Sequence, residues 1–261
     1  MYYLNLFVKF IRLGILNELE YRANFWINLM QTLMELGVAV AGLAVLFAHT
    51  DNLGGWQPEE LIALVGVYFL MGGVVRTFFR PSMSKFVEDV RTGTLDFTLT
   101  KPADSQVLVS IQRVELWRLV DVVIAIPILA MVLFRMGAQL GLADILAFAS
   151  TLFCGMVIIY SFLLILSTSA FWFVRVENIQ VIFVCLWQAG RWPMAIYPFW
   201  LRVILTFLVP IAFATTVPAS AISGRITTTT FVGSVALAAA MLMLSRWFWR
   251  LGIRYYSGAS A

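Results

Sequence analysis

The stretch that decides the fold is residues 61–106, which read LIALVGVYFLMGGVVRTFFRPSMSKFVEDVRTGTLDFTLTKPADSQ. Its first part, residues 61–79, is an apolar run, and a membrane-spanning helix needs about 20 such residues. Its second part opens the only sizeable polar sequence of the chain, residues 80–113. Together they predict a helix that crosses a membrane and leads into a polar segment on one side of it.

Comparable apolar runs recur along the chain, which has 261 residues, 61% of them hydrophobic and only 12% charged. A soluble domain carries about 25% charged residues, so the composition excludes an ordinary soluble enzyme. The other candidate spans are residues 25–48, 114–134, 145–174, 179–196 and 231–250. We therefore predict an all-α integral membrane protein with six transmembrane helices in a single domain, residues 1–261.

The remaining apolar run, residues 199–217, is interpreted from the placement of Lys and Arg, which stay on the cytoplasmic side of a membrane. With six spans and a cytoplasmic N-terminus, every basic residue is cytoplasmic except Arg135, Arg191, Arg202 and Arg225. A further crossing by residues 199–217 weakens this bias. We expect residues 199–217 to enter the outer leaflet and return, in a plasma membrane (bacterial inner membrane) protein with both termini in the cytoplasm.

The first 24 residues precede the first span and combine apolar side chains with Lys9 and Arg12, which lie three positions apart. This pattern is typical of an amphipathic helix that lies among the lipid headgroups. We therefore predict an interfacial helix over residues 1–24. The alternative is an extension of the first span.

Residues 80–113 contain a short helical pattern. Met83, Phe86, Val87 and Val90 recur at positions i, i+3, i+4 and i+7 and form one apolar stripe. Pro81 suits the start of a helix and Gly93 its end. We predict a helix along the cytoplasmic surface, with its apolar side against the membrane domain and a charged face exposed for docking. The alternative is a loop that merely connects two spans.

After Gly93 the apolar period changes from 3.6 to 2, because Leu95, Phe97 and Leu99 alternate with polar residues. This alternation predicts an extended, half-buried segment. Asp104 or Ser105 can then cap the helix that becomes the third span.

Ionisable residues inside the spans are costly in hydrocarbon and are candidate functional residues. They are Glu35 in the first span, Arg76 near the cytoplasmic end of the second, and Arg118 and Asp121 in the third. We expect Asp121 to pair with Arg118 or Arg76. No basic residue is expected at the depth of Glu35, which is either protonated and hydrogen-bonded or lines a cavity that favours cationic or polar substrates.

Motifs for enzyme chemistry are missing from the sequence. No G-x-x-x-x-G-K-[ST] loop, which would cradle the phosphates of ATP, occurs. The only histidine, His49, has no catalytic partners, and no metal-ligand motif is found. We therefore expect neither a catalytic site, a metal site nor a nucleotide-binding domain, and no cofactor bound by this chain.

Residues 86–106, FVEDVRTGTLDFTLTKPADSQ, combine an acidic residue, a GTLD turn and an L-x-K-P ending. With these three features the sequence resembles the membrane subunits of type-two ATP-binding-cassette exporters. The resemblance is to a small branch of them that was formerly called a domain of unknown function. Residues 197–220, YPFWLRVILTFLVPIAFATTVPAS, are also similar to that branch. The resemblance covers nearly the whole chain.

The resemblance implies that residues 81–92 form a coupling helix that docks a separate ATPase, which binds ATP and Mg. The docking residues are then Met83, Lys85, Phe86, Glu88, Asp89 and Arg91. It also implies that residues 192–218 form re-entrant helices that close the outer end of the pathway, with Pro193, Tyr197, Pro198, Pro210 and Pro218.

A permease of this kind works as a dimer of identical or related chains, in contact with lipid and without nucleic acid, and exports drugs, lipids or other amphipathic compounds. The alternative function is a secondary transporter or channel that is not driven by ATP. Such transporters carry broken helices in both halves, whereas here the prolines interrupt only the second half.

Overall fold

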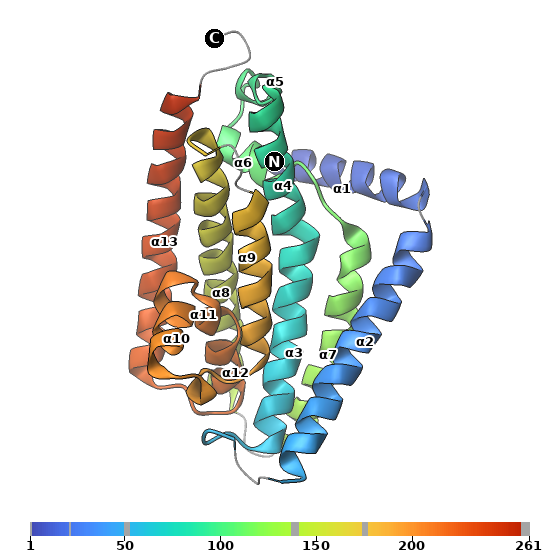
Figure 1. Cartoon of the computed structure of the whole chain (residues 1–261), viewed down its shortest axis with the longest axis vertical. Helices are drawn as coiled ribbons and strands as arrows, with labels where there is room; N and C mark the ends of the chain where they lie inside the picture. The colour runs from blue at the N-terminus through green and yellow to red at the C-terminus, as the bar shows by residue number, and fades with distance from the viewer. Residues whose placement is uncertain (1, 21, 50–52, 137–140, 174–176, 257–261) are drawn as a thin grey trace.

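The computed structural model describes residues 2–20, 22–49, 53–136, 141–173 and 177–256. Within these ranges the chain is helical apart from turns, short connections and one isolated β-bridge between Leu53 and Trp56. The long helices form one elongated bundle (Figure 1). By length and composition, five of the described helices can cross a membrane, or six if one bent pair counts as a span. An all-α multi-pass fold is therefore confirmed.

The N-terminal helix, α1 (Tyr2–Glu20), and the first long helix, α2 (Arg22–Phe47), run in different directions. α1 points away from the bundle near one end, whereas α2 slants along its edge (Figure 1). α1 is therefore not a straight extension of α2. Lys9 and Arg12 are exposed on α1, and its location among lipid headgroups stays a prediction.

The second span continues directly into the predicted surface helix. α3 (Pro58–Val74), the π-helical turn η1 (Val75–Phe79) and α4 (Arg80–Thr92) form one helix of 35 residues. Pro81 has no N–H to donate to the carbonyl of Thr77, and this carbonyl instead accepts the N–H of Glu115 at 2.9 Å. The sequence predicts a separate helix that lies along the surface, whereas in the structure α4 continues α3 (Figure 1).

The segment after α4 begins as predicted, with Gly93 in the left-handed conformation at φ 74°. The extended segment predicted next is wrong, because these residues form the helical turn α5 (Asp96–Leu99). Leu99 N–H donates to Leu95 O, so the backbone is satisfied locally and needs no partner strand. Leu95 is fully buried, whereas Phe97 is 74% exposed.

Asp104 is the N-cap of α6 (Ser105–Ile111), where its side chain accepts the N–H groups of Gln106 and Val107. The predicted cap is confirmed, but α6 ends before the third span. That span consists of the turn η2 (Leu116–Arg118) and α7 (Leu119–Met136), which packs chiefly on α3. On the other side of the bundle, α8 (Leu142–Thr168) and the turn η3 (Ser169–Phe171) pack against α13 (Thr228–Tyr255).

The region between α8 and α13 is built from short helices. α9 (Glu177–Trp187) and the turn η4 (Gln188–Arg191) form only a short apolar helix, so a full span at residues 179–196 stays a prediction. After them come η5 (Met194–Ile196), α10 (Phe199–Val203), the π turn η6 (Ile204–Leu208), α11 (Ile211–Ala214) and α12 (Thr216–Ile222). The helical stretches Phe199–Leu208 and Ile211–Ile222 meet at a bend of 69°.

This bent segment begins and ends at the same end of the bundle. At its start, Ala195 packs against Gly54, in the connection before α3. At its end, Arg225 Nε lies 2.7 Å from Glu60 Oε1, and its Nη1 donates to Gly55 O at 2.5 Å. A complete extra crossing would put Arg225 at the opposite end from Glu60. The path is therefore that of a hairpin, and its location in the outer leaflet stays a prediction.

Candidate functional site

Side chains from three helices meet around Arg76, in the π turn between α3 and α4. Arg76 Nη2 lies 2.9 Å from Asp121 Oδ2 on α7, and Nη1 lies 3.4 Å from Glu35 Oε2 on α2. Asp121 is 1% exposed, and its Oδ1 accepts the hydroxyl of Thr32 at 2.5 Å. We call these four residues the Arg76 cluster. Its contacts offset the cost of placing a carboxylate among apolar helices.

The predicted pair of Asp121 with Arg76 is confirmed. Arg118 instead approaches Glu115, with Nε 3.9 Å from Oε2. The expectation that no basic residue reaches the depth of Glu35 is wrong. The long Arg76 side chain extends from the next helix to this carboxylate, a reach that a residue's position along its own span does not reveal.

A close approach of α3 and α7 sets the position of Asp121. A Cβ on Gly73 would lie 2.6 Å from Val122 Cγ2 and 3.1 Å from Asp121 Cβ. Two turns earlier, a Cβ on Gly66 would lie 2.8 Å from Leu129 Cδ2. Small residues allow helices to pack this closely in membranes. Gly73 therefore keeps the carboxylate of Asp121 within reach of Arg76.

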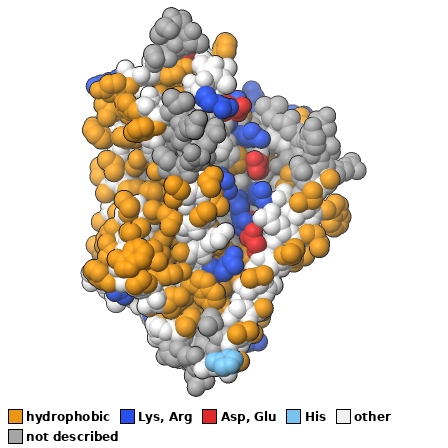
Figure 2. Space-filling model, in the orientation of Figure 1, with side chains coloured by type: hydrophobic (Ala, Val, Ile, Leu, Met, Phe, Trp, Pro, Cys, Tyr) orange, Lys and Arg blue, Asp and Glu red, His pale blue; other side chains and the backbone are white. Residues whose placement is uncertain are grey.

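A cavity of about 350 Å³ lies beside the Arg76 cluster and is bordered by α2, by α3, η1 and the start of α4, by η2, and by α9 and η4. One carboxylate, that of Glu35, lines it together with four arginines, which are Arg76, Arg80, Arg118 and Arg191. Arg191 also stacks on Tyr68, with Cζ 5.3 Å from the ring centroid. On the surface, charged side chains form a strip flanked by hydrophobic ones (Figure 2).

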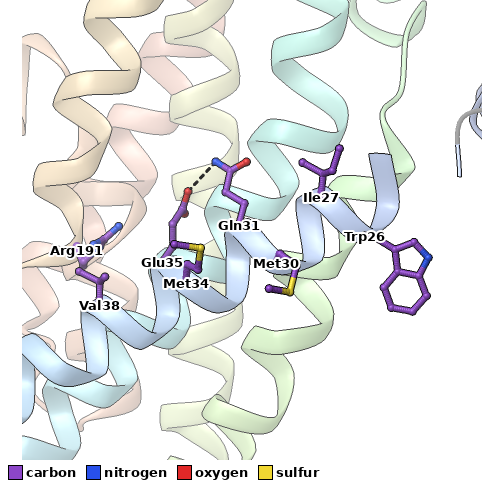
Figure 3. Close-up of a pocket in the computed structure, with 8 residues that line it drawn as sticks. All are labelled: Trp26, Ile27, Met30, Gln31, Met34, Glu35, Val38 and Arg191. Atoms are coloured by element: carbon purple, nitrogen blue, oxygen red, sulfur yellow. Dashed lines mark hydrogen bonds between the residues drawn. The ribbon is translucent and has the colours of Figure 1, made fainter. Parts of the chain in front are cut away.

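An apolar groove of about 660 Å³ adjoins this cavity along α2 (Figure 3). Its apolar lining consists of Trp26, Ile27, Met30, Met34 and Val38. The groove and the cavity share Gln31, Glu35 and Arg191. Gln31 Nε2 donates to Glu35 Oε1 at 3.1 Å. Glu35 thus lines a cavity, which is one of the two predicted alternatives. It lies at the boundary between the charged and the apolar surface.

The predicted docking residues on α4 divide into a buried and an accessible group. Met83 and Phe86 are buried, and the ring of Phe86 packs against Trp249 at 5.1 Å and Phe171 at 5.5 Å between centroids. The apolar stripe of α4 therefore faces the bundle, as predicted. In the described chain these rings stabilise the packing of α4 on α13 and η3.

On the charged face of α4, Asp89 is only 5% exposed. It accepts the hydroxyl of Thr94 at 2.8 Å, and Lys85 Nζ lies 2.8 Å from the same oxygen, Oδ1. Asp89 therefore ties α4 to the turn that follows it. Glu88 and Arg91 are exposed and Lys85 is partly exposed, so these three side chains remain accessible to a partner. Docking itself stays a prediction.

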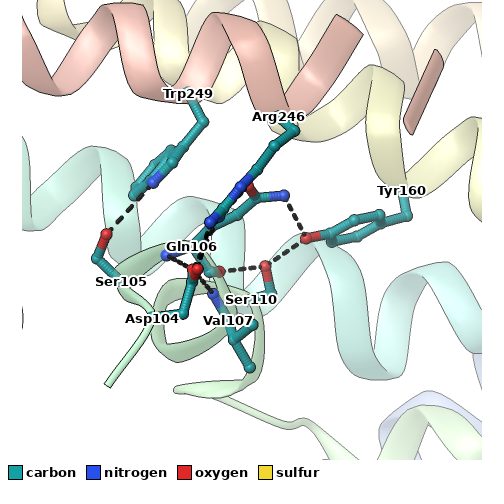
Figure 4. Close-up of polar contacts among 8 residues, drawn as sticks. All are labelled: Asp104, Ser105, Gln106, Val107, Ser110, Tyr160, Arg246 and Trp249. Atoms are coloured by element: carbon teal, nitrogen blue, oxygen red, sulfur yellow. Dashed lines mark hydrogen bonds and ion pairs between the residues drawn. The ribbon is translucent and has the colours of Figure 1, made fainter. Parts of the chain in front are cut away.

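A second polar cluster joins α6 to α8 and α13 (Figure 4). We call it the Asp104 junction, and its members are Asp104, Gln106, Ser110, Tyr160 and Arg246. Arg246 forms an ion pair with Asp104, and its Nη1 donates to Gln106 Oε1 at 2.9 Å. The hydroxyls of Ser110 and Tyr160 lie 2.7 Å apart. The hydrogen bond from Arg246 holds the pKa of Asp104 below its usual value.

Most of the residues predicted for the re-entrant region occupy breaks in its helices, and Pro218 is the exception. Pro193 and Pro198 precede η5 and α10, and Pro210 stands at the bend before α11. Pro218 is buried within α12. The hydroxyl of Tyr197 donates to Ala189 O at 2.9 Å, which fastens the start of the hairpin to η4.

Sequence reasoning missed Thr32 and Arg246 as members of these clusters, and Arg80 and Arg191 as residues that line the cavity. Arg191 carried a usable signal, because it interrupts an apolar run, and a charge inside a span is a candidate functional residue. Thr32 carried none, since a single hydroxyl within an apolar helix is common. Arg246 was used only to assign orientation, and its partner Asp104 lies 142 residues away.

Among the described residues, no group of three or more His, Cys, Asp or Glu side chains could hold a metal ion. A family model described as "ABC-2 family transporter protein" matches residues 33–260. No curated protein and no solved structure matches the chain.

Proposed function

The chain belongs to the ABC-2 family of transporter membrane proteins, and we propose that it is the permease subunit of an ATP-driven exporter. Members of this family are the membrane components of ABC transporters, so the chain is a transport subunit. Its five or six apolar helices agree with a multi-pass membrane protein. The proposed additions are that transport is export and that ATP hydrolysis by a separate subunit drives it.

The observation that carries the proposal is the arginine-lined cavity beside the Arg76 cluster. It lies between helices that are long and apolar enough to cross a membrane, and it continues into an apolar groove. Ionisable residues within spans mark transport pathways. A purely structural membrane subunit needs paired charges at most, whereas this site combines charge with about 350 Å³ of space.

In the proposed complex, a separate ATPase binds ATP and Mg and docks on the exposed face of α4, through Lys85, Glu88 and Arg91. A second permease chain, identical or related, completes the pathway. The end of the bundle that carries α4, the start of α1 and the end of α13 then faces the cytoplasm, in a plasma membrane. The exported compounds are amphipathic, such as drugs or lipids.

The test is purification of the full-length chain from its own membrane in a mild detergent, with identification of the proteins that accompany it. We expect an ATPase subunit, and ATP-dependent transport after reconstitution of the complex in liposomes. The control is the same complex with an inactive ATPase. Transport that persists without ATP would contradict the proposal and favour a secondary transporter or a channel.

The docking surface is tested separately with Glu88→Lys, which reverses an exposed charge on α4. We expect the variant to fold normally but to lose ATP-driven transport, because the partner meets the wrong charge. Glu88→Gln is the matched control and should have a smaller effect. Asp89 is unsuitable for this test, since its contacts with Lys85 and Thr94 stabilise the chain itself. Unchanged transport by Glu88→Lys would exclude this surface.

A further inference from the structure

The charges around the cavity do not cancel. Its four arginines face three carboxylates on the described elements packed around them, namely Glu35, Asp121 and Glu115. Two of these carboxylates bind the same arginine, Arg76. Among the described residues, Arg80 and Arg191 have no carboxylate within ion-pair distance. By this count the cavity as a whole carries a positive charge.

Three of the four arginines have a buried nitrogen without a hydrogen-bond acceptor among the described residues; in Arg76 it is Nη2, which lies within ion-pair distance of Asp121 without a hydrogen bond. The Nε atoms of Arg80 and Arg191 are buried and have no hydrogen-bond acceptor among the described residues. A buried donor without an acceptor is destabilising. Guanidinium groups match the planar or tetrahedral oxygens of carboxylate, phosphate and sulfate and bind them with paired hydrogen bonds. An anion in the cavity would meet these guanidinium groups, because both arginines line it.

The adjoining groove has the opposite character. Trp26, Met34 and Val38 line the groove along α2 (Figure 3), and each is more than 60% exposed. It meets the cavity at Arg191 and Glu35. The carboxylate of Glu35 shares Arg76 with Asp121, at 3.4 Å, whereas Arg191 has no carboxylate within ion-pair distance among the described residues. One molecule that reaches from groove to cavity must therefore be apolar at one end and anionic at the other.

We propose that this composite site binds an amphipathic anion, with its phosphate, sulfate or carboxylate headgroup against the arginines that line the cavity, Arg80 and Arg191 among them, and its apolar tail in the groove of α2. The inference rests on the proposed function and names the substrate class of the exporter. The cavity and the groove have the size of ordinary small-molecule sites. Arg76 positions the site, because it is held by Asp121 and Glu35, and Arg80 and Arg191 bind the headgroup.

The test uses the full-length chain with its accompanying subunits in nanodiscs of phosphatidylcholine, which has no net charge. The probe is dodecyl phosphate with a photoreactive diazirine on its tail, and labelled peptides are mapped after irradiation. We expect labelling of the α2 peptide that lines the groove. Unlabelled dodecyl phosphate should compete at least about tenfold better than dodecyltrimethylammonium, which has the same tail and a positive headgroup. Inorganic phosphate should compete poorly.

Variants locate the headgroup. Arg80→Gln and Arg191→Gln should each weaken competition by dodecyl phosphate about tenfold, the effect of losing one charge-assisted hydrogen bond. Arg202→Gln is the matched control, because this exposed arginine on α10 does not line the cavity. Size-exclusion profiles and melting temperatures should be unchanged in all three. Unweakened competition in both cavity variants would overturn the proposed headgroup position.

Other outcomes would also overturn the inference. Equal competition by the cationic amphiphile would remove the charge preference, and strong competition by inorganic phosphate would mean a site for free anions. Crosslinking of the groove to a second copy of the chain instead of the probe would make it a subunit contact. The assay needs no ATP, so the two proposals can fail separately. If the site prefers anions but no ATPase accompanies the chain, only the proposed function is refuted. If an ATPase accompanies the chain but the site does not prefer anions, only this inference is refuted.

Discussion

The Asp104 junction and the Arg76 cluster both join distant helices through arginine–carboxylate pairs, but they differ in how completely their surroundings are satisfied. In the junction, Arg246 contacts Asp104 and Gln106, and Asp104 also accepts two backbone N–H groups. Around the Arg76 cluster, the Nε atoms of Arg80 and Arg191 have no acceptor among the described residues, and a cavity lies between them.

The difference separates a structural connection from a binding site. A connection fixes geometry best when each donor has an acceptor, which the junction achieves for α6, α8 and α13. Between apolar helices water is scarce, so hydrogen-bond donors without an acceptor in the protein stay unpaired. A ligand that accepts hydrogen bonds from them gains free energy on binding. If this distinction is correct, changes in the junction should affect stability alone, whereas changes beside the cavity should affect transport.

The largest expected effect on stability is that of Arg76→Gln. It leaves Asp121 buried without a cation, which costs about 3 kcal/mol. The measurement is thermal unfolding of the purified chain, followed by fluorescence-detected size exclusion. The double variant Arg76→Gln with Asp121→Asn should recover most of the loss, because it removes the uncompensated charge. No recovery would show that Arg76 stabilises the bundle by packing instead of by this pair.

Arg246→Gln should have a smaller effect, about 1 kcal/mol, because its ion pair with Asp104 is partly exposed and screened by solvent. The same unfolding measurement applies, and binding of dodecyl phosphate should be unchanged. A loss of binding at normal stability would contradict the separation of junction and site. Arg250→Gln, one turn further along α13 and exposed, provides the control.

Glu35→Gln should lower stability by no more than about 0.5 kcal/mol, because Glu35 is partly exposed and its contact with Arg76 is long at 3.4 Å. Transport should nevertheless change while the complex still assembles, since the variant removes a negative charge from the site where cavity and groove meet. The transport rate and the melting temperature are measured in the same preparation, for the wild type and for the variant. Unchanged export of every substrate tested would remove Glu35 from the pathway.

The smallest expected effect is a pH dependence of the junction. Arg246 lowers the pKa of folded Asp104 below the unfolded value of about 3.9. The resulting stabilisation is present above that value and is lost as the pH falls through the folded pKa. The difference in melting temperature between the wild type and Asp104→Asn should stay constant above about pH 5 and narrow below about pH 4. A difference independent of pH would contradict the linkage.

Much of the fold could be predicted from local pattern. The apolar runs located the long helices, and Gly93 and Asp104 marked a helix end and a helix start because each acts through its own backbone neighbourhood. The errors arose where a partner far along the chain decides the outcome. Pro81 does not start a new helix, because a π turn accommodates it and Glu115 satisfies the carbonyl of Thr77.

The candidate site was predictable in part. Glu35, Arg76 and Asp121 stood out because charges are rare in apolar helices. Their mutual distances, the close approach at Gly73, and the convergence of Arg80 and Arg191 on one cavity depend on how helices pack, which their separate patterns do not specify. Asp89 shows the same limit: it belongs to the charged face predicted for docking, and it is buried.

The sequence by itself thus determined that the chain lies in a membrane, which segments are long helices and which charges are exceptional, because hydrophobicity and helix ends are local properties. Only the tertiary structure decided which of those charges are satisfied and which border a cavity. The free energy of a buried charge depends on atoms within a few ångströms, and these atoms come from helices that are far apart in the sequence.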